Sequence, residues 1–345
     1  MAATKKPAAN PNPRLGIIGP RGLVGEELLA LLAKKRWATD LTLISTDPKG
    51  TGRVRFRNGS LPVRGFSDFL NNKRREFDCL ISLAETDWSR GHLKKFFGTS
   101  AVIIDESAAF RLNPDVPLIV PEINGNNIKG NPPKLIASPN CTTVVLVMAL
   151  APLAKYGLRR VVAASYQAAS GAGRRARDGF LQEAKTMGNG RIKTSGFFPR
   201  PLAGNVIPQI GSFTESGFTE EEDKVIAETR KILGLADLPL SATCVRVPVL
   251  RGHSLAVWAE LEKPLPQGAL TDCYNGFPGV AVSGSYPTPV ETAGQLGVAV
   301  GRLRRDPVWP NGLSLWCSGD NLLKGAAENV LGIADLFLNP AQAPA

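Results

Sequence analysis

The sequence predicts an α/β protein of two domains, in which a mostly parallel sheet is followed by a larger mixed sheet. Over residues 13–140, short apolar strands alternate with segments of helical periodicity. Such alternation is typical of a parallel sheet covered by helices on both faces. Over residues 141–319, longer strand-like runs are separated by helical or Gly/Pro-rich segments, which indicates an α+β domain. The length of 345 residues agrees with two domains, because one hydrophobic core rarely extends so far.

The expected strands of the first domain follow one another at short intervals. They are RLGIIG (14–19), LTLIST (41–46), EFDCLISLAE (76–85), SAVIID (100–105), LIVPEIN (118–124) and KLIASPN (134–140). Between the first two, the leucines of EELLALLAKK recur at helical spacing. A last helix within residues 320–340 is expected to return and complete this domain.

The second domain is expected to open with a helix, TTVVLVMALAPLAKYG (142–157). Its strand-like runs are RRVVAASYQAASG (159–171), LSATCVRVPVL (240–250), HSLAVWAELE (253–262) and GVAVGRLRR (297–305).

Composition excludes several classes of protein. Five scattered cysteines without CxxC pairing and only two histidines argue against a disulfide framework or a metal site, and favour a reducing, cytoplasmic setting. The chain has no apolar run long enough to span a membrane, and its polar N-terminus has no signal core. The net charge of +11 is spread along the chain, so we expect a positive field for anionic small molecules and no nucleic-acid partner.

A glycine motif, GPRGLVG (19–25), lies between the first strand and the first helix. Glycines there let the backbone turn sharply and approach a pyrophosphate, which binds at the helix N-terminus. The motif therefore predicts a Rossmann-type dinucleotide-binding domain. After the second strand, Asp47 favours NAD, whereas Lys49 and Arg53 favour the 2′-phosphate of NADP. We expect NADP and leave NAD as the alternative.

Cys141 lies where a strand ends and an apolar helix begins. A helix N-terminus favours the thiolate, so this cysteine is a candidate nucleophile. The alternative is a small buried side chain that packs the helix. Position alone does not decide between them.

Polar residues in other segments are candidate active-site partners of Cys141. Gln167 is the one amide in a Gly-rich segment after a strand, and His253 follows a glycine at a strand turn. Glu221 and Lys224 are three residues apart, which on a helix is also the spacing of a solvated ion pair.

Taken together, seven segments resemble the aspartate-semialdehyde dehydrogenase family over most of the chain. They are GPRGLVG, SAAFRLNPDVPLIVPEIN (107–124), ASPNCTT (137–143), SYQAASGAG (165–173), NVIPQIGSFTESGFTEEEDKVIAETRKIL (205–233), VRVPVLRGHS (245–254) and GDNLLKGAAENV (319–330). The order and spacing of all seven segments identify the chain as a member of this family.

The resemblance implies an activity. Enzymes of this family reduce β-aspartyl phosphate to aspartate semialdehyde with NADPH, reversibly, in the biosynthesis of lysine, threonine and methionine. By similarity, Cys141 forms a thioester, His253 is the acid/base and Gln167 orients the reacting groups. Thiolate attack divides one difficult displacement into two easier steps. A homodimer formed through the catalytic domain is also implied.

The resemblance also assigns binding residues. Arg246 matches the carboxylate-binding arginine, where a planar fork suits bidentate contact. Glu221 matches the residue that receives the substrate amine. The phosphate positions match Arg111, Asn140 and Lys224. The cofactor positions match Gly19, Arg21, Gly22, Leu23, Val24 and Gly25 of the loop, with Ser170, Gly171 and Asn321 near the nicotinamide.

The sequence departs from the family in the cofactor half. Pro20 and Arg21 replace a small Ala-Thr pair, and SLAETDWSR (82–90) replaces a segment rich in Gly and Ser. These changes bear on cofactor preference more than on chemistry. Two alternatives therefore remain: a non-catalytic or altered-cofactor homologue, and a reductase of another acyl phosphate such as N-acetylglutamyl phosphate. The Glu221 and Lys224 block argues against the latter, because an acetylated amine needs no anionic partner.

Overall fold

A computed structural model of the chain describes residues 12–70, 76–129, 131–188, 193–266 and 270–339. The chain divides into two compact units, Met1–Pro139 with Ala327–Ala345, and Asn140–Ala326. The functional domain limits expected from the sequence, 13–140 with 320–340 and 141–319, stay a prediction. Residues 1–11 of the polar N-terminal segment and residue 340 of the expected last helix lie outside the described residues.

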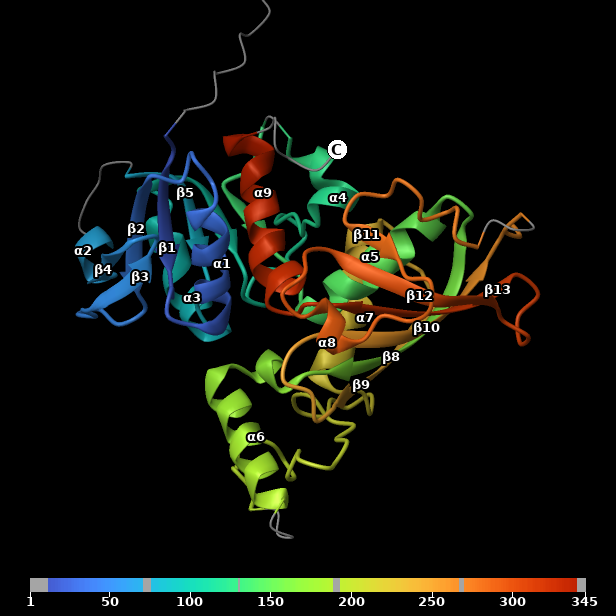
Figure 1. Ribbon diagram of the computed structural model, residues 1–345. Helices are drawn as coiled ribbons and strands as arrows, with labels where there is room; N and C mark the ends of the chain where they lie inside the picture. The colour runs from blue at the N-terminus through green and yellow to red at the C-terminus, as the bar shows by residue number, and fades with distance from the viewer. Residues whose placement is uncertain (1–11, 71–75, 130, 189–192, 267–269, 340–345) are drawn as a thin grey trace, which may run out of the picture. The chain divides into compact units, whose positions relative to one another are not determined.

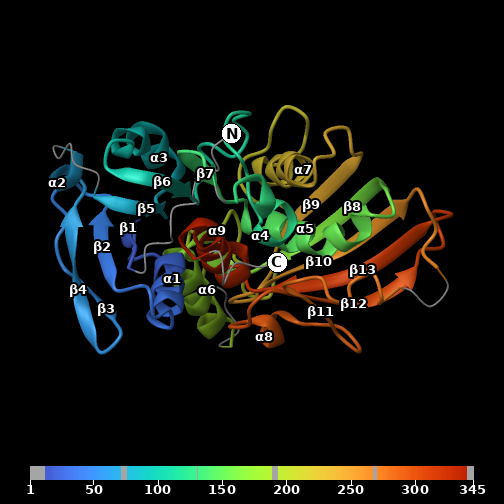
Figure 2. The ribbon, with the colours of Figure 1, turned by 90° about the horizontal axis from the view of Figure 1, so that it is seen from above.

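The first unit is built on a seven-stranded sheet in the order β3-β4-β2-β1-β5-β6-β7, of which Figure 1 labels β1 to β5 and Figure 2 also labels β6 and β7. All neighbouring strands are parallel except β3, which pairs antiparallel with β4. The strands are β1 (Arg14–Ile18), β2 (Asp40–Ser45), β3 (Arg53–Phe56), β4 (Gly59–Gly65), β5 (Phe77–Ser82), β6 (Ser100–Asp105) and β7 (Leu135–Ala137). The helices of this unit are α1 (Leu23–Ala33), α2 (Ser67–Leu70), α3 (Thr86–His92), α4 (Pro121–Asn124) and α9 (Glu328–Leu338), with short 3-10 turns at Leu93–Phe96 and Gly125–Asn127.

Two local expectations differ from this structure. The segment 118–124 is no strand: Leu118 makes a single bridge to Ala137, and Pro121 then starts α4. Proline suits the first position of a helix, because its fixed φ is helical and its missing N–H is not needed there. The hairpin of β3 and β4 was not expected, because β3 is only four residues long and β4 contains two glycines and a proline, residues that are depleted in strands.

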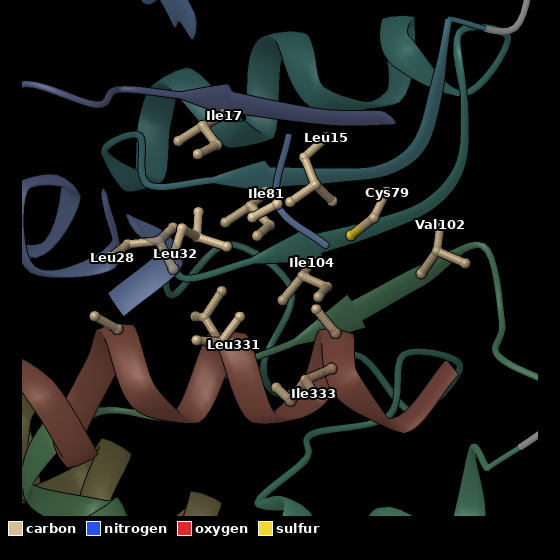
Figure 3. Packing of buried hydrophobic residues seen from close by; sticks show 14 of the residues in the cluster. Leu15, Ile17, Leu28, Leu32, Cys79, Ile81, Val102, Ile104, Leu331 and Ile333 are labelled. Carbon is tan, nitrogen blue, oxygen red and sulfur yellow. The ribbon is translucent and has the colours of Figure 1, made fainter. Parts of the chain in front are cut away.

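The core of the first unit lies between the parallel sheet and the helices α1 and α9. Ile17 of β1, Ile81 of β5 and Ile104 of β6 are fully buried there, with Leu32 of α1 and Ile333 of α9 (Figure 3). Residues that alternate with them, Ile18, Leu80 and Ile103, have no exposed surface either. Both faces of the sheet are therefore covered, and α9, the last helix, packs in this core.

The second unit is built on a six-stranded mixed sheet in the order β11-β12-β13-β10-β8-β9 (Figure 2). The pairs β8–β9 and β11–β12 are parallel and the other pairs are antiparallel. The strands are β8 (Leu158–Gln167), β9 (Leu240–Arg246), β10 (His253–Leu261), β11 (Val280–Val282), β12 (Val298–Arg305) and β13 (Gly312–Gly319). The helices are α5 (Cys141–Ala154), α6 (Arg174–Met187), α7 (Glu220–Leu233) and α8 (Pro289–Thr292), with a 3-10 turn at Ala169–Ala172 and a π-turn at Leu323–Ala327 that ends at the unit boundary.

Helices α5 and α7 have clear sequence causes. Nearly every residue of α5 is apolar and buried, because the helix packs on β8, β10, β12 and β13. Helix α7 opens with a reciprocal cap, in which Thr219 accepts from the Glu222 N–H and Glu222 accepts from the Thr219 N–H. It ends at Gly234, whose φ of 67° is in the left-handed region. Residues 221 and 224 therefore lie on a helix, as expected.

Candidate active site

Several strands of the second unit bring their ends to one edge of the sheet. Gln167 ends β8 and is the register partner of Arg246, which ends β9. His253 begins β10, which runs antiparallel to β8, and is the register partner of Gly319 at the end of β13. Because β8, β9 and β13 end where β10 begins, residues from distant parts of the sequence lie together.

Cys141 is the first residue of α5, and the next residue, Thr142, contacts the Gln167 amide at this edge of the sheet through its hydroxyl group. Asn140 caps the helix: its side-chain oxygen accepts from the N–H groups of Thr142 at 2.8 Å and Thr143 at 3.2 Å. Gly325 lies so close that an added Cβ would approach Cys141 Cβ to 2.8 Å. The main chain around the cysteine is thus tightly packed, while its side chain is half-buried.

The other four cysteines, Cys79, Cys244, Cys273 and Cys317, are buried. Burial raises the pKa of the Cys244 and Cys317 thiols to about 12 and that of Cys273 to about 11. Burial and the negative charge of Asp78 also raise the pKa of the Cys79 thiol. These four thiols are unsuited to act as nucleophiles near neutral pH, which leaves Cys141.

Glu221 lies within hydrogen-bond reach of two amides. Asn140 Nδ2 donates to Glu221 Oε1 at 2.9 Å, and Gln167 Nε2 donates to the same oxygen at 3.0 Å. Gln167 Nε2 also contacts Thr142 Oγ1, and Gln167 Oε1 is buried without a hydrogen-bond partner among the described residues. An unpaired buried amide oxygen is costly, so it is an acceptor available to a ligand.

His253 has no exposed surface and is oriented by the main chain. The Ala168 N–H donates to its Nδ1 at 3.0 Å, so we infer that the neutral ring carries its proton on Nε2. No residue in the described ranges bonds Nε2. Burial, aided by the positive charge of Arg246, lowers the pKa of His253 to about 3. The imidazole is therefore neutral near pH 7, with an Nε2–H group ready to donate.

Arg246 is buried and reaches the same place. Its Nη1 donates to the Ala168 carbonyl oxygen at 2.7 Å. Burial lowers the pKa of Arg246, while the charges of Glu221 and Cys141 raise it. A Cβ added to Gly171 would lie 2.9 Å from Arg246 Nη1 and 3.1 Å from His253 Nε2. Glycine at position 171 therefore leaves room beside both groups.

Two predicted cofactor residues of this unit are joined directly. Ser170 Oγ donates to Asn321 Oδ1 at 3.1 Å, and the Gly252 N–H donates to the same oxygen at 2.9 Å. Asn321 is thus tied to the residue before His253. Lys224 lies three residues after Glu221 on α7, but no described contact joins its ammonium group to the other site residues.

In the first unit, a cavity of about 410 Å³ lies at the carboxyl ends of β1, β2 and β5. The sheet order reverses between β1 and β5, which is where open α/β sheets bind nucleotides. Its lining includes Gly19, Arg21 and Gly22 of the predicted loop. The other lining residues are Pro20, Ser45, Thr46, Val63, Leu83, Ala84, Glu85 and Trp88.

The glycine loop fits a dinucleotide phosphate. A Cβ at Gly25 would lie 2.4 Å from the Pro20 carbonyl oxygen, so only glycine lets the loop fold onto the start of α1. Gly19 has a φ of 74° and lies against the Leu83 carbonyl. The first turn of α1, which includes Leu23 and Val24, presents N–H groups that have no acceptor within the helix.

The cations near this cavity are not equivalent. Arg21 lines it and donates through Nη2 to the Thr51 carbonyl oxygen. Arg53 is instead engaged with Ser60 on the β3–β4 hairpin. Asp47 is turned toward its own loop, where Oδ1 accepts from the Lys49 N–H at 2.9 Å. Neither Asp47 nor Lys49 is among the lining residues, whereas Glu85 and Trp88 are.

Arg111, also in the first unit, is buried and anchored to the main chain. Its Nε donates to the Ser138 carbonyl oxygen at 2.8 Å and its Nη2 to the Glu106 carbonyl oxygen at 2.6 Å. The guanidinium is therefore held in place next to Asp105, whose pKa is raised by burial.

Comparison with known proteins assigns the chain to a family. Residues 14–131 match the semialdehyde dehydrogenase, NAD binding domain family, and residues 150–324 match the semialdehyde dehydrogenase, dimerisation domain family. The aspartate-semialdehyde dehydrogenases of Aquifex aeolicus and Synechocystis are 36% and 37% identical to it over 94% and 95% of this chain and 98% of each relative. The chain belongs to the aspartate-semialdehyde dehydrogenase family. The first unit thus carries a nicotinamide-dinucleotide-binding domain, and the predicted family and fold class are confirmed.

A solved structure agrees with this assignment. The aspartate semialdehyde dehydrogenase II of Vibrio cholerae, complexed with ASA, superposes with a TM-score of 0.86 and 31% identity over 94% of this chain and 98% of that chain. Members of this aspartate-semialdehyde dehydrogenase family are oxidoreductases, and this chain shares their architecture over nearly its full length.

The described parts of the chain hold no group of three or more His, Cys, Asp or Glu side chains that could bind a metal ion. Every helix among them falls short of the length and apolar character that a bilayer-spanning helix requires.

Sequence reasoning missed three contributors to the site: the Thr142 hydroxyl, the Ala168 main chain and Glu228. Glu228 Oε2 accepts from the Asn140 N–H at 2.7 Å. A signal was present, because Glu228 is an acidic residue on the buried face of α7, seven residues after Glu221.

Proposed function

We propose that the protein catalyses the reversible, NADPH-dependent reduction of β-aspartyl phosphate to aspartate semialdehyde, in the biosynthesis of aspartate-family amino acids. The observation that carries this proposal is the meeting of Cys141, Gln167, Arg246 and His253 at one edge of the second sheet. The relatives named aspartate-semialdehyde dehydrogenase and the ASA complex of one of them support the substrate class.

The chemistry follows from the groups present. The Cys141 thiolate attacks the acyl carbon and phosphate leaves, so a thioester forms. When bound, NADPH supplies the hydride that reduces this thioester to a thiohemiacetal. His253 Nε2–H donates a hydrogen bond to the oxygen of both tetrahedral species. It shares its proton with the oxygen of the thiohemiacetal and takes it back when the C–S bond of that species breaks. The aldehyde and the thiolate are then released.

Binding of the substrate is assigned to charged groups of opposite sign. Arg246 provides a buried planar cation for the carboxylate. The Glu221 carboxylate, which now bonds two amides, would receive the ammonium group. Lys224, Asn140 and Arg111 are assigned to the phosphate. An acidic Glu221 in the site is the feature that favours an aspartyl substrate over an acylated amino acid.

For the cofactor, we propose NADP rather than NAD. Arg21 lines the cavity together with the hydroxyl groups of Ser45 and Thr46, a combination that suits a 2′-phosphate. The Asp47 carboxylate, the group that would favour NAD, bonds its own loop instead. Gly19, Gly22 and the first turn of α1, Leu23 to Gly25, would hold the pyrophosphate. In the second unit, Ser170, Gly171 and Asn321 are assigned to the nicotinamide end.

The deciding experiment mixes folded, reduced protein with aspartate semialdehyde, phosphate and NADP, and follows the absorbance of the reduced cofactor. We expect turnover, and we expect Cys141→Ala to abolish it. Cys273→Ala, which removes a buried thiol of the same unit, should keep activity. Absence of turnover with both NADP and NAD would overturn the proposed activity, and activity in Cys141→Ala would overturn the assigned nucleophile.

A further inference from the structure

Asn140, the residue before the proposed nucleophile, forms hydrogen bonds both within its own helix α5 and with helix α7. Its side-chain oxygen caps α5, and its Nδ2 donates to Glu221 at 2.9 Å. Its main-chain N–H donates to Glu228 Oε2 at 2.7 Å. Glu221 and Glu228 are seven residues apart, two turns of α7, and so lie on the same face of that helix.

Glu228 has no exposed surface. A carboxylate is expensive to bury unless hydrogen bonds compensate it, and one of its oxygens takes the Asn140 N–H. Its negative charge also raises the pKa of Lys231, against a larger lowering by burial. The Glu228 carboxylate is therefore held in the interior against the N–H of Asn140, the residue before Cys141.

This contact fixes a main-chain segment that the helix itself leaves unconstrained. The N–H of an N-cap residue has no acceptor inside its helix, so the Pro139–Asn140 peptide can tilt unless another group holds it. A tilt there moves Cys141 Cα and with it the direction of the thiol. Misplacement of a reacting group by about 1 Å can cost a hundredfold in rate.

We propose that Glu228 is a positioning residue, which acts through the Asn140 N–H to hold Cys141 in its reactive orientation. The proposal rests on the proposed function only in naming Cys141 as the nucleophile. It does not require Glu228 to touch the substrate. The positioning of Cys141 depends on a hydrogen-bond acceptor at the right distance and does not depend on the negative charge of Glu228.

The test compares three substitutions by a measurement that is independent of turnover. Iodoacetamide should modify Cys141 selectively in the folded protein, because the other four thiols are buried. The rate is followed by peptide mass spectrometry across a range of pH. Glu228→Ala should slow the pH-independent rate of Cys141 modification about ten- to a hundredfold, as for misplacement of a reacting group. Its kcat should fall by a similar factor with KM little changed.

Conservative variants separate geometry from charge and remain informative if the alanine variant does not fold. Glu228→Gln keeps an acceptor oxygen at the same chain length and should stay within about threefold of the wild type. Glu228→Asp keeps the charge on a side chain one methylene shorter and should be slow. Asp223→Asn removes an acidic group from the exposed side of α7 and serves as the matched control.

The opposite pattern, with Glu228→Asp fast and Glu228→Gln slow, would overturn the proposal, as would a folded Glu228→Ala that reacts at the wild-type rate. Because alkylation needs neither substrate nor cofactor, these outcomes are distinct from a failure of the proposed activity.

Discussion

His253 lies among neighbours that keep it neutral. It is fully buried, the positively charged Arg246 is nearby, and the Ala168 N–H occupies Nδ1. Because Nε2 already carries a proton, further protonation would have to occur at Nδ1, which would then lose the hydrogen bond from Ala168. The ring is therefore suited to donate from Nε2 as a neutral group.

This lowered pKa predicts a dependence of stability on pH. Below pH 6.5 the unfolded chain protonates residue 253, whereas the folded protein resists protonation until about pH 3. The unfolded state then binds more protons, so the free energy of unfolding falls as the pH falls through this window, by at most about 1.4 kcal/mol per pH unit. The free energy of unfolding of wild type and of His253→Gln can be measured in urea between pH 7 and pH 4, on the order of three pH units. It should fall more steeply for wild type than for the variant as the pH is lowered. A constant difference between the two would contradict the neutral, buried imidazole.

Arg21 and Lys49 make a matched pair for cofactor preference. Arg21 lines the cavity at the end of β1, whereas Lys49 lies on the exposed loop outside its lining. We expect Arg21→Ala to weaken NADP binding about tenfold and NAD binding much less, because loss of a phosphate contact removes a charge-assisted hydrogen bond. Lys49→Ala should leave both unchanged.

The measurement is direct, because Trp88 lines the same cavity and its fluorescence should report nucleotide binding. If Arg21→Ala weakens NAD and NADP equally, Arg21 does not contact the 2′-phosphate. Glu85 is the acidic residue in this lining, opposite in charge to Arg21. If the wild-type protein prefers NAD, then Glu85 and not Arg21 determines the cofactor preference.

At the scale of elements, the glycine loop combines a folding requirement with a binding requirement, and the two can be separated. Gly25 lies against the Pro20 main chain, where no side chain fits. Gly22 has an ordinary φ of −72°, and an added Cβ there would come no closer than 3.9 Å to its nearest atom.

Gly25→Ala should therefore lower the free energy of unfolding by about 1–3 kcal/mol, the usual cost of overpacking. Gly22→Ala should leave stability unchanged and still weaken dinucleotide binding, because its Cβ would stand where the pyrophosphate approaches the backbone. Thermal unfolding and nucleotide titration of both variants check this. Equal stability of the two variants would show that the loop relaxes around residue 25.

Helix α7 is an element whose buried face is partly acidic. Glu221, Glu222 and Glu228 all accept hydrogen bonds from groups outside the helix or at its cap. The cap and the helical spacing of Glu221 and Lys224 were predictable, because they depend on neighbours in the sequence. The partners Asn140 and Cys244 are far away in the sequence, so no local pattern reveals them.

At the scale of the molecule, the mixed sheet of the second unit has an outer face of apolar residues. Val161 and Ala163 of β8 point inward and are buried, whereas Val162 and Tyr166, on the other face, are 40% and 37% exposed. The Tyr166 ring packs on Trp316 of β13 at 5.3 Å. Exposed apolar surface of this kind favours a protein partner, and this part of the chain matches a dimerisation domain family.

We expect a homodimer that buries this face. Val162→Glu would place a carboxylate in the interface at a cost of about 3 kcal/mol or more, and should shift the protein toward monomer in light scattering after size exclusion. Val308→Glu, at a valine with 74% exposure in the loop between β12 and β13, should remain dimeric. A dimer unaffected by Val162→Glu would place the interface elsewhere.

By itself, the sequence determined the class of the fold, the two sheets, the glycine loop and the family. Each of these depends on local periodicity or on motifs in a fixed order: the strand expected at 14–19 is found at 14–18, and the helical periodicity of 26–35 overlaps most of the helix at 23–33. Cys141, Gln167, Arg246 and His253 were named because their segments follow the order of a family, while the residues alone left Cys141 between packing and catalysis.

Only the tertiary structure decided which of these groups meet and what holds them. The register of β8, β9 and β10 brings Gln167, Arg246 and His253 to one edge. The Ala168 N–H selects the imidazole tautomer, and Glu228 takes the Asn140 N–H across 88 positions in the sequence. The physical reason is that hydrogen bonds between distant segments depend on distance and direction in space, which periodicity and composition do not encode.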